Sequence, residues 1–198
     1  YMKQKILLIA LLCISTFTEV FSQCATTIIA SGGTSGNARC PMTRYRNARS
    51  HYLITAAEMA AAGFGPGNSI DGISWNYSTA PTISGAGNLK VYLENTADVA
   101  NLKGNNFATA IAPMTLAHNA VNTLPAAAGF FNVTFSGGTP FTYSGGGVYV
   151  AFDWDYCAGT LDVAGVVSCN TALAAGLQGL QNLGACAVLT TLAASAFR

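Results

Sequence analysis

The chain has 198 residues, of which nine are Lys or Arg and eight are Asp or Glu, so its formal net charge at pH 7 is only +1. This balance excludes a broad basic surface, and we expect no nucleic-acid partner. The length suits one domain with a sizeable core. The low charged fraction, 9%, fits an exported β-protein whose surface carries hydroxyl and amide groups.

The first segment has the pattern of a secretory signal peptide. Two lysines precede an apolar run over residues 6–14, and Ser22 is a small residue at the expected cleavage position. The run is shorter than the roughly 20 apolar residues that a membrane span needs. We therefore expect removal of residues 1–22, no stable membrane insertion afterwards, a secreted or cell-surface location, and a single domain over residues 23–198.

A short helix is predicted over about residues 56–62. Thr55 and Glu58 have the spacing of a capping box, in which each side chain accepts a hydrogen bond from the other residue's backbone amide. Gly63 supplies the C-terminal stop.

From residue 69 onward, apolar residues alternate with polar ones, which predicts strands with one buried face. Weaker strands are predicted over residues 114–121 and 188–193, and the linkers are rich in turn formers. The pattern predicts a mainly β fold, an antiparallel β-sandwich that is jelly-roll-like. The clearest alternating triples are Ile73, Trp75 and Tyr77; Leu89, Val91 and Leu93; and Phe131, Val133 and Phe135.

The stretch FTYSGGGVYVAFDWD, residues 141–155, joins three glycines to a predicted strand. A phosphate-binding loop is excluded because such a loop opens a helix. The glycines instead predict positive φ angles in a hairpin or bulge. The strand should bury Trp154 and turn Tyr149, Asp153 and Asp155 outward.

This outward row is the predicted ligand site. Asp153 and Asp155 lie about 7 Å apart on one face of a strand, where they can hold Ca²⁺ together with loop carbonyls. They can also form a carboxylate pair of a glycosidase, or be ordinary solvent-facing residues. Exposed tyrosines can stack on sugars or on partner proteins, and the tyrosines expected at polar-facing or loop positions are Tyr45, Tyr52, Tyr92, Tyr143, Tyr149 and Tyr156.

Catalysis is not expected from the remaining residues. His51 and His118 are the only histidines, no nucleophile elbow is present, and the cysteine spacing does not match a zinc site. We therefore predict a protein that is not an enzyme and has no resident cofactor, with Ca²⁺ at Asp153 and Asp155 as the one metal alternative.

Five cysteines remain once residues 1–22 are removed, and export permits disulfides. Cys24 with Cys40 and Cys157 with Cys169 are plausible local pairs, which leaves Cys186 over. Spacing alone does not decide the connectivity.

Several stretches resemble a module of secreted Bacteroidetes surface proteins that usually carry a type IX secretion C-terminal sorting domain. They are YLITAAEMAAAGFGPGNSIDGISWNYS, NLKVYLENT, FNVTFSGGTPFTYSGGGVYVAFDW and the ending SCNTALAAGLQGLQ…TLAASAFR. The resemblance extends over roughly residues 44–198. It implies a jelly-roll-like sandwich similar to adhesin and carbohydrate-binding modules, with no catalytic residues to carry over. Such proteins continue into further modules, so we expect this chain to be part of a longer multidomain protein.

These features together predict a non-catalytic extracellular module for adhesion or ligand binding at a bacterial cell surface, with a surface protein or a glycan as partner. One alternative is an accessory carbohydrate-binding domain of a secreted hydrolase. A weaker alternative is a self-contained hydrolase that uses Asp153 and Asp155.

Overall fold

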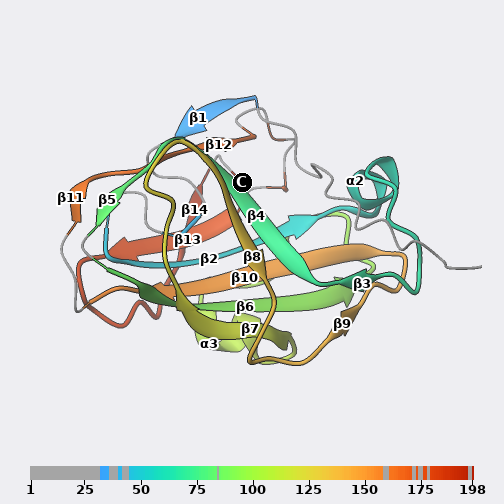
Figure 1. Cartoon of the computed structure of the whole chain (residues 1–198). Coiled ribbons are helices and arrows are strands. Elements are labelled where there is room, and N and C mark those ends of the chain that lie inside the picture. The colour runs from blue at the N-terminus through green and yellow to red at the C-terminus, as the bar shows by residue number, and fades with distance from the viewer. Residues whose placement is uncertain are drawn as a thin grey trace, which may run out of the picture.

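The computed structural model describes residues 32–35, 40–41, 45–83, 85–157, 161–170, 173, 176–177, 179–195 and 198. Within this part of the chain, two antiparallel sheets pack face to face as a β-sandwich (Figure 1). The predicted signal peptide and Cys24 lie outside the described residues.

The strand order is β1-β12-β4-β8 in the four-stranded sheet and β14-β13-β2-β10-β6-β7 in the six-stranded sheet, counted over the described residues. The four-stranded sheet consists of β1 (Gly33–Ser35), β12 (Val166–Cys169), β4 (Gly72–Thr79) and β8 (Gly129–Thr134). The six-stranded sheet consists of β14 (Ala193–Ser195), β13 (Gly179–Gly184), β2 (Asn47–Ile54), β10 (Gly147–Asp155), β6 (Gly87–Thr96) and β7 (Thr115–Asn122). Two short pairs are β3 (Ser69–Ile70) with β9 (Phe141–Thr142), and β5 (Thr82–Ile83) with β11 (Leu161–Val163).

The connectivity is that of a jelly roll. Strand β1 pairs with β12, β2 with β10, and β6 with both β10 and β7, while β4 lies between β12 and β8; all these pairs are antiparallel. The first of these eight strands is thus next to the last and the second is next to the seventh, as in two interlocked Greek keys. The predicted fold is confirmed. Strands β13 and β14 extend the larger sheet beyond β2.

The predicted helix is present as α2 (Ala56–Ala61), and its capping box is formed. Thr55 Oγ1 accepts from the Glu58 amide at 3.3 Å, and Glu58 Oε2 accepts from the Thr55 amide at 2.9 Å. Gly63 has a φ of 84°. A second helix, α3 (Phe107–Ile111), was not predicted. In the part of the chain described, no helix is both long and apolar enough to cross a membrane.

The main core lies between the two sheets, where the predicted apolar faces meet. Trp75 of β4 contacts Phe131 on its own sheet and Phe152 of β10 on the opposite sheet, with ring centroids 5.9 and 5.6 Å apart. Trp154 is completely buried. These contacts confirm that the alternating residues face inward.

A second apolar cluster covers part of the outer face of the six-stranded sheet. Its buried members come from β2, β10, α3 and two loops, and Figure 1 shows α3 on the side of this sheet that faces away from β4 and β8. One end of the sheet is therefore covered on both faces. The members are Leu53, Phe107, Met114, Tyr149, Ala151 and Leu192.

Strand β2 was not predicted, although it lies between β13 and β10 in the sheet. Residues 50–54 are all buried. Because side chains on both faces of the strand are covered, polar and apolar residues do not alternate, and the basic start of the strand resembles a surface loop in sequence.

Two details of the predicted turns and strands were wrong. Of the glycine triplet only Gly145 has a positive φ, 102°, and β9 pairs with β3 rather than with β10, so there is no hairpin. Gly146 instead allows its backbone to lie close against the backbone of Thr96, because a Cβ at this position would lie 2.3 Å from the Thr96 carbonyl oxygen. The strand predicted over residues 188–193 is mostly loop, since β14 starts only at Ala193.

Candidate functional site

The uncovered end of the six-stranded sheet carries a group of polar side chains on its outer face. In the ladder, Asp153 is opposite Arg49 and Lys90, and Asp155 is opposite Asn47 and Asn88. Three neighbouring strands therefore present two carboxylates, two cations and two amides in adjacent rows.

These six side chains and the loop after β13 line a pocket of about 170 Å³, which we call the polar pocket. The loop contributes Ala187, Val188 and Leu189. Val188 is 77% exposed, so an apolar side chain stands at the rim of a polar floor. Asp153 and Asp155, both predicted as ligand residues, lie in this pocket.

Arg49 connects the polar pocket to the covered end of the sheet. Its Nη2 lies 2.8 Å from Asp153 Oδ2, and its Nη1 donates to the Leu189 carbonyl oxygen at 2.7 Å. The guanidinium carbon is 4.9 Å from the ring centroid of Phe107 in α3. The arginine thus fixes one carboxylate and one end of the loop that forms the pocket wall.

Asp155 is exposed and is oriented by its neighbours. Its Oδ1 accepts from the Cys157 amide at 2.9 Å. When the Asn47 side-chain amide is oriented to satisfy both of its polar atoms, its nitrogen donates to the same carboxylate oxygen at 3.2 Å. Asp155 is therefore held in place while remaining open to solvent, which suits a ligand contact.

Tyr149, the third predicted ligand residue, is not on an exposed surface, and that expectation was wrong. Its side chain is only 2% exposed because residues 98–103 cover it. The hydroxyl accepts from the Leu102 amide at 2.9 Å and donates to Asp98 Oδ2 at 2.8 Å. Lys103 Nζ lies 4.8 Å from the ring centroid. Burial, as the main cause, raises the pKa of Tyr149 to about 12.

Most of the other tyrosines expected at the surface are also buried, so they offer no stacking platform. The two exceptions are Tyr45, which is 39% exposed, and Tyr92, which is partly buried against the second apolar cluster. Burial raises the pKa of Tyr52 above its ordinary value of 10.0. The buried members of the set are Tyr52, Tyr143, Tyr149 and Tyr156.

Both histidines are structural. His51 Nε2 lies 3.0 Å from the Gly104 carbonyl oxygen, and His118 Nδ1 accepts from the Ser136 amide at 3.1 Å. Burial lowers the pKa of both imidazoles. Each ring holds a loop against the sheet.

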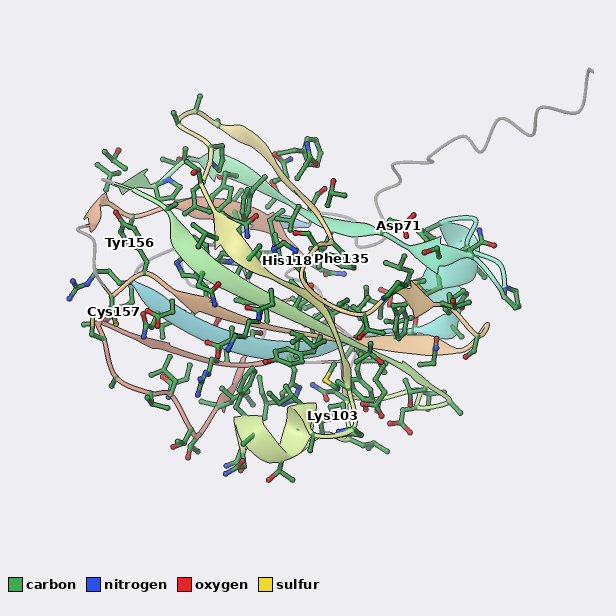
Figure 2. The ribbon with its side chains drawn as sticks, turned by 60° about the horizontal axis from the view of Figure 1, so that its bottom comes forward. Asp71, Lys103, His118, Phe135, Tyr156 and Cys157 are labelled. Carbon is green, nitrogen blue, oxygen red and sulfur yellow. The ribbon has the colours of Figure 1, made fainter. Side chains whose placement is uncertain are left out.

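The cysteines do not follow the local pairing predicted for Cys157. Cys169 is 5% exposed in the core on the four-stranded sheet, and Cys40 is completely buried in the same cluster. Cys157 follows β10 of the opposite sheet, and Figure 2 shows it at one end of the sandwich with Tyr156. Its neighbour there is Cys186, which was left over in the local scheme.

No group of three or more His, Cys, Asp or Glu side chains within the described residues has the arrangement of a metal site. Calcium takes six to eight oxygen ligands. The polar pocket offers two aspartates, one of which is already paired with Arg49.

The sequence analysis missed the three loop residues of the pocket and its four other polar residues, which are Asn47, Arg49, Asn88 and Lys90. Asn88 and Lys90 face opposite to Leu89 and Val91, so their side of the sheet was predictable, but their position beside the aspartates depends on which strands pair. Strand pairing across a jelly roll joins residues about 60 to 100 positions apart, and short local patterns do not specify it.

A search against protein-family models, curated proteins and solved structures found no match to this chain. The resemblance to the Bacteroidetes surface module stays a prediction.

Proposed function

We propose that this chain is a non-catalytic binding module of an exported bacterial surface protein, and that the polar pocket is its ligand site. The observation that supports this proposal is the set of charged and amide side chains held in adjacent rows on three strands, next to a loop with an exposed valine. A site on strands holds its side chains more rigidly than a site on loops.

The charges of the polar pocket restrict the ligand. Two carboxylates face two cations, so the pocket favours neither a polyanion nor a polycation. Carboxylate and amide groups accept and donate hydrogen bonds to hydroxyl and amide groups, which both sugars and polypeptides offer. A neutral, hydrogen-bonding segment of a partner is the ligand chemistry that fits.

The size of the pocket favours contact with part of a large partner. Sites that take a small molecule whole are typically about 300 to 1,000 Å³, whereas this pocket has about 170 Å³. It holds one or two side chains or a single sugar ring. Val188 at the rim adds an apolar contact of the kind found at the centre of protein interfaces.

The absence of an aromatic side chain among the nine pocket-lining residues separates the two candidate ligand classes. Carbohydrate sites commonly combine hydrogen bonds with a ring that stacks on the sugar, and none of the pocket-lining residues supplies such a ring. We therefore place adhesion to a protein surface first. An accessory carbohydrate-binding domain of a secreted hydrolase is the second candidate, supported by the paired carboxylates and amides.

The proposal is tested by binding to immobilised extracellular-matrix proteins, to mucin and to a glycan array. Asp155→Asn should weaken protein binding about tenfold or more, because it changes the charge of the exposed carboxylate in the pocket. Asp71→Asn is the matched control, since Figure 2 shows Asp71 far from Cys157, which lies two residues after Asp155 of the pocket.

Each outcome of this test has a distinct meaning. Equal binding by both variants and the wild type would place the ligand site elsewhere. Binding to glycans alone, reduced by Asp155→Asn, would favour the carbohydrate-binding candidate. Turnover of a glycoside that is lost in Asp153→Asn would contradict the non-catalytic proposal.

A further inference from the structure

Cys157 and Cys186 lie close together at one end of the six-stranded sheet, beside Asp155 and the loop residues that line the polar pocket. Strands β10 and β13 both pair antiparallel with β2, so they run in the same direction on either side of it. Asn47 is the partner of Asp155 on one side and of Gly184 on the other. Each cysteine lies two residues beyond the end of its own strand. Because the two strand ends are aligned on β2, both cysteines lie at the same end of the sheet.

Each cysteine sulfur lies against the backbone of the other cysteine's segment. Cys186 Sγ lies 3.5 Å from the Cys157 carbonyl oxygen, and Cys157 Sγ lies 4.0 Å from the Ala185 carbonyl oxygen. The backbone of Cys157 is fixed, because its carbonyl also accepts from Arg46 Nη1 at 3.2 Å. Both residues are present as thiols, and Cys186 is exposed.

We infer that Cys157 and Cys186 form a disulfide bond that fixes one wall of the polar pocket. The bond joins two strand ends that the sheet has already brought together. It replaces the local pairing with Cys169, which is buried on the other sheet.

The oxidation requires a low-molecular-weight disulfide such as oxidised glutathione. The Cys186 thiolate attacks one sulfur of this disulfide, which releases one thiolate and forms a mixed disulfide on Cys186. The Cys157 thiolate then attacks the Cys186 sulfur and releases the second small thiolate. The two protons lost by the cysteines pass to the two released thiolates, so the protein loses two electrons and two protons while the reagent gains them.

The electrostatics around Cys157 fit this order of attack. The pKa of its thiol is raised to about 11, chiefly through its hydrogen bond with the Cys186 thiol and then through burial. Asp155 raises this pKa further, while the Asn47 side chain, 3.3 Å from the sulfur, lowers it. Because only a thiolate attacks a disulfide, the raised pKa disfavours Cys157 as the first attacking group.

The disulfide acts on the pocket through the loop that follows it. Residues 187–189 form the pocket wall directly after Cys186. Their far end is held by the hydrogen bond from Arg49 to Leu189, and the disulfide fixes the near end. A disulfide that fixes this loop should also affect ligand binding. That effect rests on the proposed function of the polar pocket, whereas the existence of the bond does not.

The test begins with the purified full chain, incubated either with oxidised glutathione or with a reductant. Remaining thiols are alkylated, and non-reducing peptide mass spectrometry then identifies the pairs. We expect a peptide linked through Cys157 and Cys186.

The oxidised form should show a melting temperature higher by on the order of 5–10 °C, since the bond closes a loop between positions 29 apart. Hydrogen exchange over residues 185–190 should also be slower.

Cys157→Ser and Cys186→Ser are the matched variants, and each should abolish the difference between oxidised and reduced protein. If a variant fails to fold, the mass spectra of the wild type still decide. Alkylated thiols at both positions after oxidation, or a bond from either cysteine to Cys40 or Cys169, would overturn the inference. Binding to the same matrix proteins, mucin and glycan array is measured on both redox forms. Absence of all binding from both forms would count against the proposed function, while the mass spectra would still decide the disulfide.

Discussion

The outer face of the six-stranded sheet has two ends that share the same strands but differ in their cover. At one end, Leu53 and Tyr149 lie under α3 and the loop of residues 98–103. At the other end, Asp153 and Asp155 of the same strand β10 border a pocket. The alternation of side chains along β10 decides on which face of the sheet each side chain lies. A segment from elsewhere in the chain decides whether that face is buried.

Arg49 marks the boundary between the two ends. It contacts Phe107 on the covered side and Asp153 on the open side. Its long apolar stem and charged head suit such a position, because the stem packs while the head remains hydrogen-bonded. The comparison of the two ends leads to four predictions, which follow from the largest expected effect to the smallest.

Trp154→Ala should cost about 3–5 kcal/mol in the free energy of unfolding, as large-to-small substitutions of buried aromatics do. The indole is completely buried between the sheets, close against Gly87. Asp155→Ala, one position along and on the open face, is the control and should cost less than about 0.5 kcal/mol. Urea unfolding measures both. A small loss in Trp154→Ala would mean that the inner face is loosely packed at this end.

Tyr149→Phe should cost about 1–3 kcal/mol, because it removes the buried hydroxyl that the Leu102 amide and the charged Asp98 carboxylate share. Hydrogen exchange should rise mainly in residues 98–106. Tyr45→Phe, at a 39% exposed position, is the control. Unchanged exchange in this loop would show that the ring alone, and not its hydroxyl, holds the cover.

Much of the sandwich follows from local patterns in the sequence. The alternating triples of β4, β6 and β8, the capping box at Thr55 and the buried Trp154 each depend on residues a few positions apart. Periodicity and capping spacing reveal such features directly. The jelly-roll arrangement then follows from many short antiparallel strands separated by turns.

The candidate site was predictable only in part, for a physical reason. The outward orientation of Asp153 and Asp155 follows from the period of two. The burial of Tyr149 depends on a loop about 50 residues earlier in the chain, and the pairing of Asp153 with Arg49 depends on β2, whose two covered faces remove the alternation. Burial and strand pairing are tertiary properties that a strand pattern does not contain.

Stability should fall as the pH decreases below about 6.5, with His51 and His118 as the cause. Burial lowers the pKa of both from the ordinary value of 6.5, so the unfolded chain binds protons more readily than the folded one. The stabilisation is complete above the unfolded pKa and is lost as the pH falls through the lower folded values. These are the chain's two histidines.

Urea midpoints at pH 8, 6.5 and 5 measure this dependence. His51→Gln should make the midpoint depend less on pH, because it removes one of the two titrating groups. This variant tests the covered end of the sheet, where His51 lies against Gly104. Identical midpoints at pH 8 and pH 5 would show that neither imidazole resists protonation.

The smallest effect should come from the ion pair at the open end. In a double-mutant cycle, Arg49→Gln and Asp153→Asn should show a coupling energy of only about 0.5–1 kcal/mol, because both side chains remain partly exposed, 22% and 18%. Added salt should reduce it further. A coupling above about 2 kcal/mol would mean that solvent screens this pair poorly, so that the open end of the sheet resembles the covered end more than its exposure indicates.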